Sequence, residues 1–273
     1  MTNIVNSKNQ KGQAVLIILL SLSVVLIIVL FIMSRSVTDI SLSTKDENAL
    51  RAFSAAEAGV ERVLITGSGT GQLSIGDALF NASVTGFAEG ATEVVYPISL
   101  KSGENATFWF SRLGETNVYT APTVKYCWGD KNTTVDGLAP ALEITTYYLE
   151  AGVYKVARAT LDPNSSRASS NNFSAATNGT CTIDGQEFQF YSTIGLPSTG
   201  LQYATAKMLY NTTTAHKVAI DGNGLGFFPS QGQKIISDGS YGDANRKLEV
   251  FQLHPIAPPV FANAIFSATG ITK

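Results

Sequence analysis

An uncharged, strongly apolar run near the N-terminus constrains this chain more than any other feature. Residues 13 to 33 read QAVLIILLSLSVVLIIVLFIM and contain no Asp, Glu, Lys or Arg. A helix needs about 20 such residues to cross the hydrocarbon core of a bilayer. The run therefore predicts a transmembrane helix over residues 13–34, preceded by a leader over residues 1–12.

The charges on either side of the run predict its orientation. Lys8 and Lys11 precede it, whereas Arg35 on the far side is soon followed by acidic residues. Positive charge favours the cytoplasmic side, so we expect the N-terminus inside the cell and the remainder outside. A secretory signal peptide is the alternative, but its apolar core is usually 7 to 15 residues long and ends in a small-x-small site. This run is longer, and no A-x-A site follows it directly.

The helix is expected to continue beyond the membrane. Between residues 36 and 64 there is no Pro, and the first Gly is Gly59. Apolar residues recur there at spacings of mostly three or four, which predicts an amphipathic helix over residues 35–65. The Gly-rich segment 67–71 ends it. The whole helix has about 50 residues and a length of roughly 75 Å. The apolar stripe consists of Val37, Ile40, Ala49, Phe53, Ala56, Val60 and Val63.

The remainder of the chain, residues 72–273, is predicted to form a mostly β head. Short runs of β-branched and aromatic residues alternate there with Gly, Asn, Asp and Pro turns. The segment 142–156 reads as a β-hairpin with a short Gly-containing loop. The predicted fold class is therefore α+β, with a long N-terminal helix and an extracellular β head. The clearest strand segments are 92–100, 106–110, 123–128, 142–149, 153–159, 187–193, 204–210 and 247–253.

Two polar or proline-rich regions interrupt this pattern. Residues 162–180 are small and polar, which is compatible with an exposed loop or with a seam between sub-domains. We see no internal repeat and expect one elaborated head domain. Near the end, a proline-stiffened stretch from Pro255 leads into the apolar segment 260–267, which predicts a last strand docked on the sheet or a tail donated to a partner.

The two cysteines, Cys127 and Cys181, both lie in the head. In an exported head they are expected to pair across a loop of about 50 residues, a constraint on the order of 4 kcal/mol in the chain-entropy treatment. The alternative is a pair of buried free thiols.

The sequence offers little sign of a cofactor. Two turn-like segments place oxygen ligands near one another, Asp221 with Asn223 and Asp238 with Asp243, as calcium sites do. Neither completes an EF-hand, and Asp-Gly turns are common in β proteins for conformational reasons. Calcium therefore stays a weak expectation, and no other cofactor is expected.

Catalytic and nucleic-acid-binding patterns are also missing from the sequence. The two histidines, His216 and His254, lie outside any nucleophile signature, and there is no P-loop or Rossmann glycine pattern. The formal net charge is -2, so no basic surplus indicates nucleic-acid binding. We expect a protein that is not an enzyme.

The N-terminal segment resembles a known family. A basic residue and glycine, Lys11-Gly12, stand directly before the apolar run, and the segment Ala52-Phe-Ser-Ala-Ala-Glu-Ala58 stands in the distal part of the predicted helix. Over residues 11–64 the chain is similar to PilX-type minor pilins and K-type minor pseudopilins. The resemblance implies cleavage by a prepilin peptidase between Gly12 and Gln13 and N-methylation of Gln13. It also implies the membrane, other pilin subunits and a pilus assembly platform as partners, and helix packing in a filament through Ile17, Phe53, Ala55, Ala56 and Glu57.

One position departs from the pattern of major pilins. Those proteins carry a glutamate five residues into the mature chain, where it neutralises the N-terminal amine of a neighbouring subunit, but this chain has Ile17. K-type pseudopilins, which sit at filament tips, also lack that glutamate. The resemblance therefore implies a minor pilin or pseudopilin at or near the tip of a type IV pilus or related filament, for assembly priming or surface adhesion. The alternatives are a single-pass anchored adhesin that never enters a filament and, further behind, an anchored hydrolase.

Overall fold

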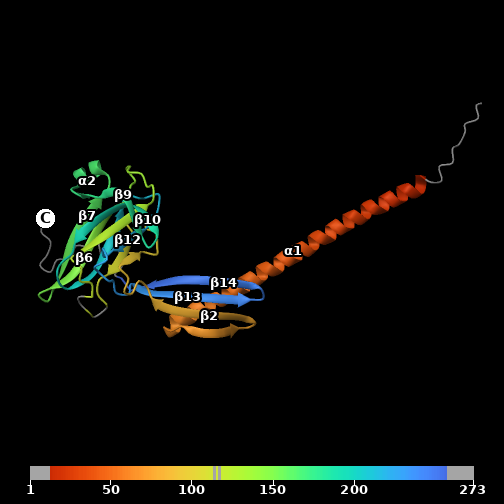
Figure 1. Ribbon diagram of the computed structural model, residues 1–273, viewed down its shortest axis with the longest axis horizontal. Helices are drawn as coiled ribbons and strands as arrows, with labels where there is room; N and C mark the ends of the chain where they lie inside the picture. The colour runs from red at the N-terminus through yellow and green to blue at the C-terminus, as the bar shows by residue number, and fades with distance from the viewer. Residues whose placement is uncertain (1–12, 113–114, 116–117, 257–273) are drawn as a thin grey trace, which may run out of the picture. The chain divides into compact units, whose positions relative to one another are not determined.

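The computed structural model describes residues 13–112, 115 and 118–256 and has an α+β fold (Figure 1). One long apolar helix at the N-terminus is followed by a mostly β head with three sheets, which confirms the predicted fold class. The chain divides into two compact units. The first contains the residues up to 83 together with 236–248, and the second contains 84–235 and the residues from 249 onward.

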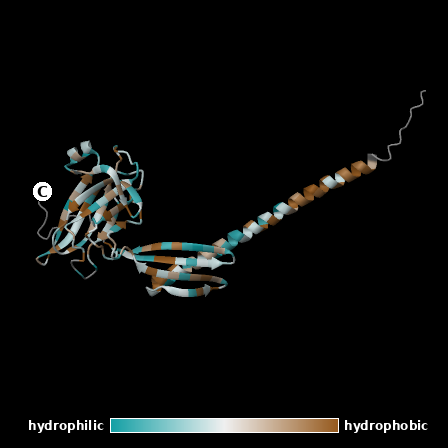
Figure 2. Ribbon diagram, viewed as in Figure 1, coloured by the Kyte–Doolittle hydropathy of each residue, from teal (hydrophilic) through white to brown (hydrophobic). Residues whose placement is uncertain are grey.

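The N-terminal helix, α1 (Gln13–Thr66), is continuous over 54 residues. It joins the predicted membrane segment to the predicted amphipathic segment without a break. Gly67 ends it in the left-handed conformation (φ 68°), where its N–H donates to the carbonyl of Val63. Figure 2 shows the first part of α1 as strongly hydrophobic and the part nearer the head as mixed.

The first unit pairs the C-terminal third of α1 with a four-stranded sheet. The strand order is β1 (Thr70–Ile75), β2 (Ala78–Gly86), β13 (Gly232–Tyr241) and β14 (Ala244–Leu253), and the last three strands have their remaining residues in the second unit. In β2, buried Ala78, Phe80 and Ala82 alternate with exposed neighbours, as expected for a sheet with one covered face. The residues of α1 buried in this unit are Ala52, Ala55, Ala56, Gly59, Val60 and Val63.

Small residues let the helix backbone approach β13 very closely. A Cβ at Gly59 would collide with the side-chain oxygen of Ser237, and a Cβ at Gly239 would collide with the carbonyl of Ala52 and the amide nitrogen of Ala56. Such contacts require glycine because any larger side chain would push the helix away from the strand. Sequence patterns did not indicate β1, β2 or β13, since these strands contain many Ala, Gly and Ser residues and few β-branched ones.

The second unit contains two five-stranded sheets. The described strand pairs in it are antiparallel except β7–β8. One sheet has the order β3 (Glu93–Val95), β12 (Val218–Asp221), β5 (Thr123–Asp130), β10 (Gln186–Gly195) and β9 (Thr177–Ile183). The other has the order β4 (Asn105–Trp109), β11 (Leu201–Leu209), β6 (Ala141–Glu150), β7 (Val153–Asp162) and β8 (Ser174–Ala175).

The strand predictions for this region are largely confirmed. Each of the eight segments expected from the sequence contains a strand, and 142–156 forms the predicted hairpin, with Glu150 opposite Val153. Ala151 and Gly152 at its tip have φ values of 52° and 79°, the two positive values that a type I′ turn requires.

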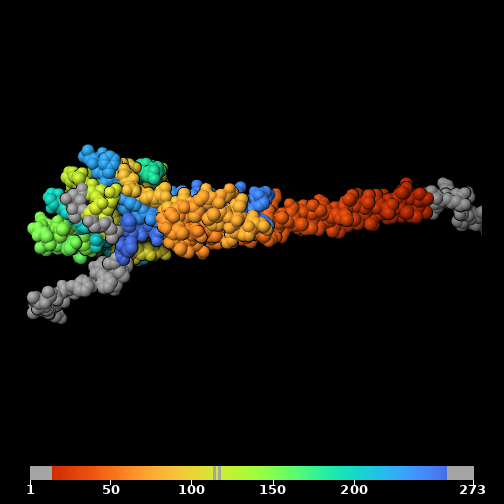
Figure 3. All heavy atoms as spheres, turned by 90° about the horizontal axis from the view of Figure 1, so that it is seen from below, coloured from red at the N-terminus to blue at the C-terminus, as the bar shows by residue number. Residues whose placement is uncertain are grey.

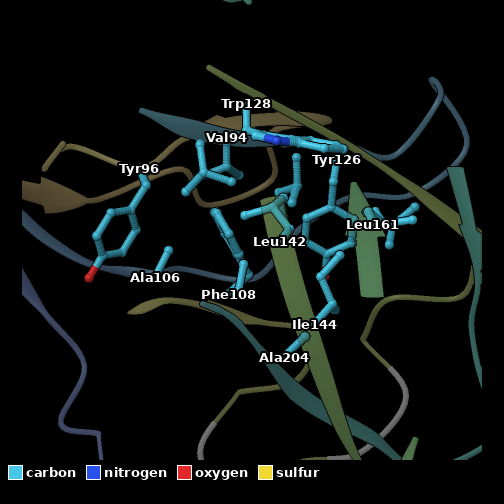
Figure 4. Close-up of a cluster of buried hydrophobic side chains, with 14 of the residues drawn as sticks. Val94, Tyr96, Ala106, Phe108, Tyr126, Trp128, Leu142, Ile144, Leu161 and Ala204 are labelled. Carbon is cyan, nitrogen blue, oxygen red and sulfur yellow. The ribbon is translucent and has the colours of Figure 1, made fainter. Parts of the chain in front are cut away.

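The main core of the second unit takes side chains from both of its sheets. Tyr126 and Trp128 of β5 meet Phe108 of β4 and Leu142 and Ile144 of β6, as Figure 4 shows. The Trp128 indole N–H donates to the carbonyl of Pro140 at 2.8 Å, so the largest core side chain leaves no polar atom unpaired.

Residues 162–180 are neither a loop nor a domain seam, so that expectation was wrong. They contain the short helix α2 (Ser165–Asn171), β8 and the start of β9. Asn164 caps α2, and Arg167 of α2 donates to both carboxylate oxygens of the fully buried Asp162, at 2.6 and 2.8 Å. Arg167 also donates to the carbonyls of Gly137 and Ala139, which lie 30 and 28 residues away in the chain. The small polar composition of the segment gave no sign of these longer-range contacts. The two units separate instead near residues 83, 235 and 248.

Two sequence expectations fall outside the described residues. These are the leader over residues 1–12, with Gly12 at its end, and the fate of the apolar segment 260–267 as a docked strand or a donated tail.

Candidate functional site: the uncovered surface of the long helix

The N-terminal part of α1 is not covered by any other described part of its unit. The large apolar side chains from Val15 to Met33 are between 45 % and 66 % exposed (Figure 3). The helix is long and apolar enough to cross a membrane. A surface of this size is not stable in water, so the helix is a candidate membrane anchor.

The uncovered apolar surface continues past the length that a membrane needs. Val37, Ile40 and Leu42 are between 59 % and 68 % exposed, although they lie beyond the predicted span of residues 13–34. The next 16 residues of the helix, 35–50, extend over about 24 Å. Within this section, residues 35–47 are all exposed, so they are covered neither by a bilayer core nor by the chain's own sheet.

A stripe of exposed residues runs along α1 on the side opposite its sheet. Leu50, Phe53, Glu57, Glu61 and Leu64 are all exposed and recur at spacings of three and four, so they lie on one face of the helix. The stripe mixes apolar and acidic side chains. We call it the outer stripe.

The residues that the family resemblance assigns to filament packing divide into two groups. Ile17 and Glu57 are exposed and Phe53 is 39 % exposed, so all three are available to a neighbouring molecule. Ala55 and Ala56 are instead fully buried in the first unit. Their small size serves the close contact between α1 and its own sheet, which is a correction to their expected role.

Polar contacts hold the helix where it leaves the sheet. Arg51 pairs with Glu47 at 2.7 Å, donates to the Tyr241 hydroxyl at 3.1 Å and lies over the Tyr241 ring. The hydrogen bond to Glu47, with the charges of Tyr241 and Glu47, raises the pKa of Arg51. Asn48 donates to Asp243, which lowers the pKa of that carboxyl. These contacts join one turn of α1 to the turn between β13 and β14.

Cys127 and Cys181 form a disulfide, with their Cα atoms 6.2 Å apart. The bond joins β5 to β9 and is buried in a small cluster with Ile183, Phe188 and Ala219. The cluster lies on the opposite face of β5 from Tyr126 and Trp128, because successive strand residues point to opposite faces.

The weak calcium candidates do not form one site. Asp221 and Asn223 belong to the second unit, where the carboxylate of Asp221 accepts the Asn223 backbone N–H at 2.6 Å in a tight turn. Asp238 and Asp243 belong to the first unit. No group of three or more His, Cys, Asp or Glu side chains positioned for a metal occurs among the described residues.

Two recesses in the described part of the second unit differ in character. The larger, about 840 Å³, contains an ion pair between Lys234 and Glu249 at 2.9 Å and an edge-to-face contact between Phe87 and Phe251. The smaller, about 270 Å³, is lined by His216 and by residues of two loops. Its lining includes the buried Asn211, whose side-chain oxygen has no hydrogen-bond partner.

Comparison with family models, with curated proteins and with solved structures finds no match to this chain. Functional assignment therefore depends on the surface of α1 and on the residues of the head. The sequence analysis assigned Phe53 and Glu57 of the outer stripe to filament packing, but it missed that the stripe extends to Leu50 and Leu64. It also missed the close contacts made by the glycines at 59 and 239. The spacing of small residues at 52, 55, 56 and 59 was visible, but it does not by itself distinguish packing on a sheet from packing on another helix.

Proposed function

We propose that this chain is a minor pilin or pseudopilin, cut after Gly12 by a prepilin peptidase and built into a type IV pilus or related filament. It would occupy a position at or near the tip, where it primes assembly or presents its β head for surface adhesion. The observation that carries the proposal is the exposed apolar surface of α1 beyond the length of a membrane span.

The dimensions of α1 support a helix with two successive environments. Its 54 residues extend over about 81 Å, whereas the hydrocarbon core of a bilayer is about 30 Å thick. A simple anchor needs only the first part. A subunit that leaves the bilayer and enters a bundle of helices would bury Val37, Ile40 and the outer stripe against its neighbours.

The position near the tip rests on the family resemblance and on Ile17. A subunit without a carboxylate at this position would leave the N-terminal amine of a neighbour unpaired in an apolar bundle, which is costly. A subunit at the end of a filament has fewer neighbours, so fewer N-terminal amines need a carboxylate from it.

The processing step is tested by mass spectrometry of the N-terminus of the protein isolated from cells with an active prepilin peptidase. The expected mature chain starts at methylated Gln13. A Gly12→Leu variant, which removes the small residue before the cut, is expected to keep Met1. Intact Met1 in the wild type would contradict the proposal and favour an anchored binding module.

Filament packing is tested by a photo-crosslinking amino acid placed at Ile40. In isolated filaments it is expected to link this chain to other subunits. The matched control is Tyr154 on β7, which is 76 % exposed but lies in the second unit, far along the chain from α1. Crosslinks from Ile40 to lipid alone would indicate a helix that never leaves the membrane surface.

A further inference from the structure

The part of the chain after residue 71 is rich in the pattern Asn-x-Ser/Thr, in which x is not Pro. Seven of its twelve asparagines begin such a pattern, although Ser and Thr together make up only about a fifth of the residues there, so about two would be expected by chance. This pattern is the acceptor motif for N-linked glycans in exported proteins. The seven are Asn81, Asn105, Asn132, Asn164, Asn172, Asn178 and Asn211.

The disulfide between Cys127 and Cys181 supports a head on the outer side of the membrane, where such glycans are attached. Disulfides form and persist in oxidising compartments and are rare in the cytosol. This support does not involve the filament, so the inference about glycans does not depend on the proposed function as a pilin.

Glycan transfer uses two side chains of the pattern at once. The amide nitrogen of Asn becomes bonded to the sugar, while the transferase holds the hydroxyl two residues later. Side chains two residues apart point to the same side where the backbone is extended. A pattern whose backbone is bonded into a helix or a sheet cannot be taken up in this way without the loss of those hydrogen bonds. An acceptor in the folded protein must therefore be exposed and lie outside regular structure.

Three of the seven asparagines are poor acceptors because they are covered. Asn105 and Asn164 are only partly exposed, and Asn211 is 1 % exposed. The Nδ2 of Asn211, to which a sugar would be joined, donates to the carbonyls of Leu100 and Thr214 at 2.8 and 3.1 Å. A glycan on that nitrogen would require the head to open.

Three others are exposed but belong to regular structure. Asn81 lies within β2, which is paired on both sides, with β1 and with β13. Asn178 lies within β9, and its Oδ1 accepts from Gln189 at 2.8 Å. Asn172 caps the C-terminal end of α2, where its backbone N–H donates to the carbonyl of Ala168. Each would have to leave its helix or strand to enter a transferase.

Asn132 is the one of the seven that meets both conditions. Asn132 and Thr134 are exposed and lie in the loop 131–140 between β5 and β6, which contains no helix or strand. Within the part of the chain that the structure describes, the side-chain amide of Asn132 has no hydrogen-bond partner. Its backbone N–H donates at 2.9 Å to a side chain, that of Gln189, and not to a neighbouring strand. The Thr134 hydroxyl donates only to the exposed Asp136.

We propose that Asn132 carries an N-linked glycan, transferred from a lipid-phosphate-linked oligosaccharide by a transferase on the outer side of the membrane. The bond between the anomeric carbon of the donor sugar and the phosphate oxygen breaks, and a bond between that carbon and Asn132 Nδ2 forms. The lipid phosphate leaves with the electron pair, and Nδ2 gives up one proton to a base of the transferase. The step involves no oxidation or reduction.

Peptide mass spectrometry of the full chain, isolated from the cells that produce it, measures the modification of each asparagine. The expected result is a glycan mass on the peptide that contains Asn132 and none on the peptide that contains Asn211. These two asparagines are a matched pair, because both begin the tripeptide Asn-Thr-Thr and they differ in burial.

Two variants separate the acceptor motif from the loop structure. Thr134→Ala removes the hydroxyl but keeps Asn132, and it is expected to lose the glycan mass from that peptide. Thr134→Ser restores a hydroxyl and is expected to keep it. Both variants should retain the disulfide between Cys127 and Cys181, which reports a folded and exported head. The proposal is overturned if Asn132 is unmodified in the wild type, if Asn211 also carries a glycan, or if Thr134→Ala is modified as fully as Thr134→Ser.

Discussion

Buried polar side chains in this protein differ sharply in how completely their hydrogen bonds are satisfied. Arg167 is surrounded by acceptors, donating to Asp162 and to the carbonyls of Gly137 and Ala139. Tyr126, by contrast, is fully buried in the main core, and its hydroxyl has no partner. Burying an unpaired hydroxyl costs free energy, so the two residues have opposite consequences for stability.

Replacing Tyr126 by Phe is expected to stabilise the fold. The change removes the unpaired hydroxyl while keeping the ring that packs on Phe108. The gain is expected to be about 1 kcal/mol, or a Tm increase of roughly 3 °C. Thermal unfolding followed by circular dichroism measures it, with the exposed Tyr154→Phe as a control that should change nothing. A Tm loss in Tyr126→Phe would mean that the hydroxyl has a partner in solution.

Buried tyrosines also predict how stability depends on alkaline pH. Burial raises the pKa of Tyr126, and burial together with the charge of Asp221 raises the pKa of Tyr119 to about 12. An unfolded tyrosine has a pKa of about 10. Because the folded state favours the neutral phenol, this contribution is complete below pH ~10 and is lost as pH rises toward the folded pKa values.

Phenolate absorbance and circular dichroism should therefore change together in the late part of an alkaline titration. Tyr126→Phe should move the unfolding midpoint to higher pH. If all tyrosines ionised near pH ~10 without loss of secondary structure, the burial argument would fail.

At the scale of elements, the contact between α1 and β13 decides how the first unit is built. Gly59 faces Ser237, and Gly239 faces the backbone of Ala52 and Ala56. The side-chain oxygen of Ser237 is buried and has no partner. The helix and the strand are therefore in contact through atoms that leave no room for another methyl group.

A double-mutant cycle tests this contact. Gly59→Ala adds a methyl group that collides with the Ser237 hydroxyl, and it is expected to destabilise by about 1 kcal/mol, since overpacking outweighs the gain in helix propensity. Adding Ser237→Ala removes the colliding oxygen and should recover that loss or more. Thermal unfolding of the two single variants and the double variant gives the coupling, and Ser54→Ala on the exposed side of α1 is the control. Additive effects would show that the two side chains do not meet.

For the whole molecule, the two units have different sources of stability. The first depends on a helix seated on a small sheet, whereas the second has two sheets, a large aromatic core and the disulfide between Cys127 and Cys181. A change in the disulfide should therefore act on the second unit.

Replacing both cysteines by Ala is expected to destabilise the second unit. The bond closes a sequence separation of 54 residues, and releasing a loop of that size costs about 4 kcal/mol, or a Tm loss of roughly 10 °C. The melting curve of the double variant should be insensitive to reductant, whereas that of the wild type should shift. A wild-type curve that is unchanged by complete reduction would contradict the expected contribution.

A second molecular prediction concerns Ile17. If the proposed tip position is correct, Ile17→Glu supplies a carboxylate that can pair with a neighbour's amine and should move the subunit toward internal filament positions. Immunogold labelling of filaments measures the distribution, with Ile18→Gln as a polar control that adds no charge. Wild-type label along whole filaments would contradict the tip position.

Sequence patterns captured the features that depend on local order. Residues 13–66 form one helix because they are apolar or amphipathic without interruption, and Gly67 ends it for conformational reasons. The hairpin over 142–156 was equally clear, since its strands are rich in β-branched and aromatic residues and its turn contains Gly152. Part of the candidate site on α1 was located in the same way, because Val37 and Ile40 continue the apolar pattern past the predicted membrane segment 13–34.

What the sequence by itself determined is therefore the long membrane-type helix, the α+β class and most strands of the second unit, because periodicity and turn chemistry act over a few residues. Only the tertiary structure showed that Ala55 and Ala56 pack on the chain's own sheet, that Asp162 and Arg167 order residues 162–180, and that Asn211 and His216 share one recess. Each of these also depends on partners farther along the chain: Ala55 packs with Ala78 and Phe80, Arg167 donates to the carbonyls of Gly137 and Ala139, Asn211 donates to the carbonyl of Leu100, and His216 contacts Asp130. The approach of these partners is decided by how the sheets pack and not by local sequence.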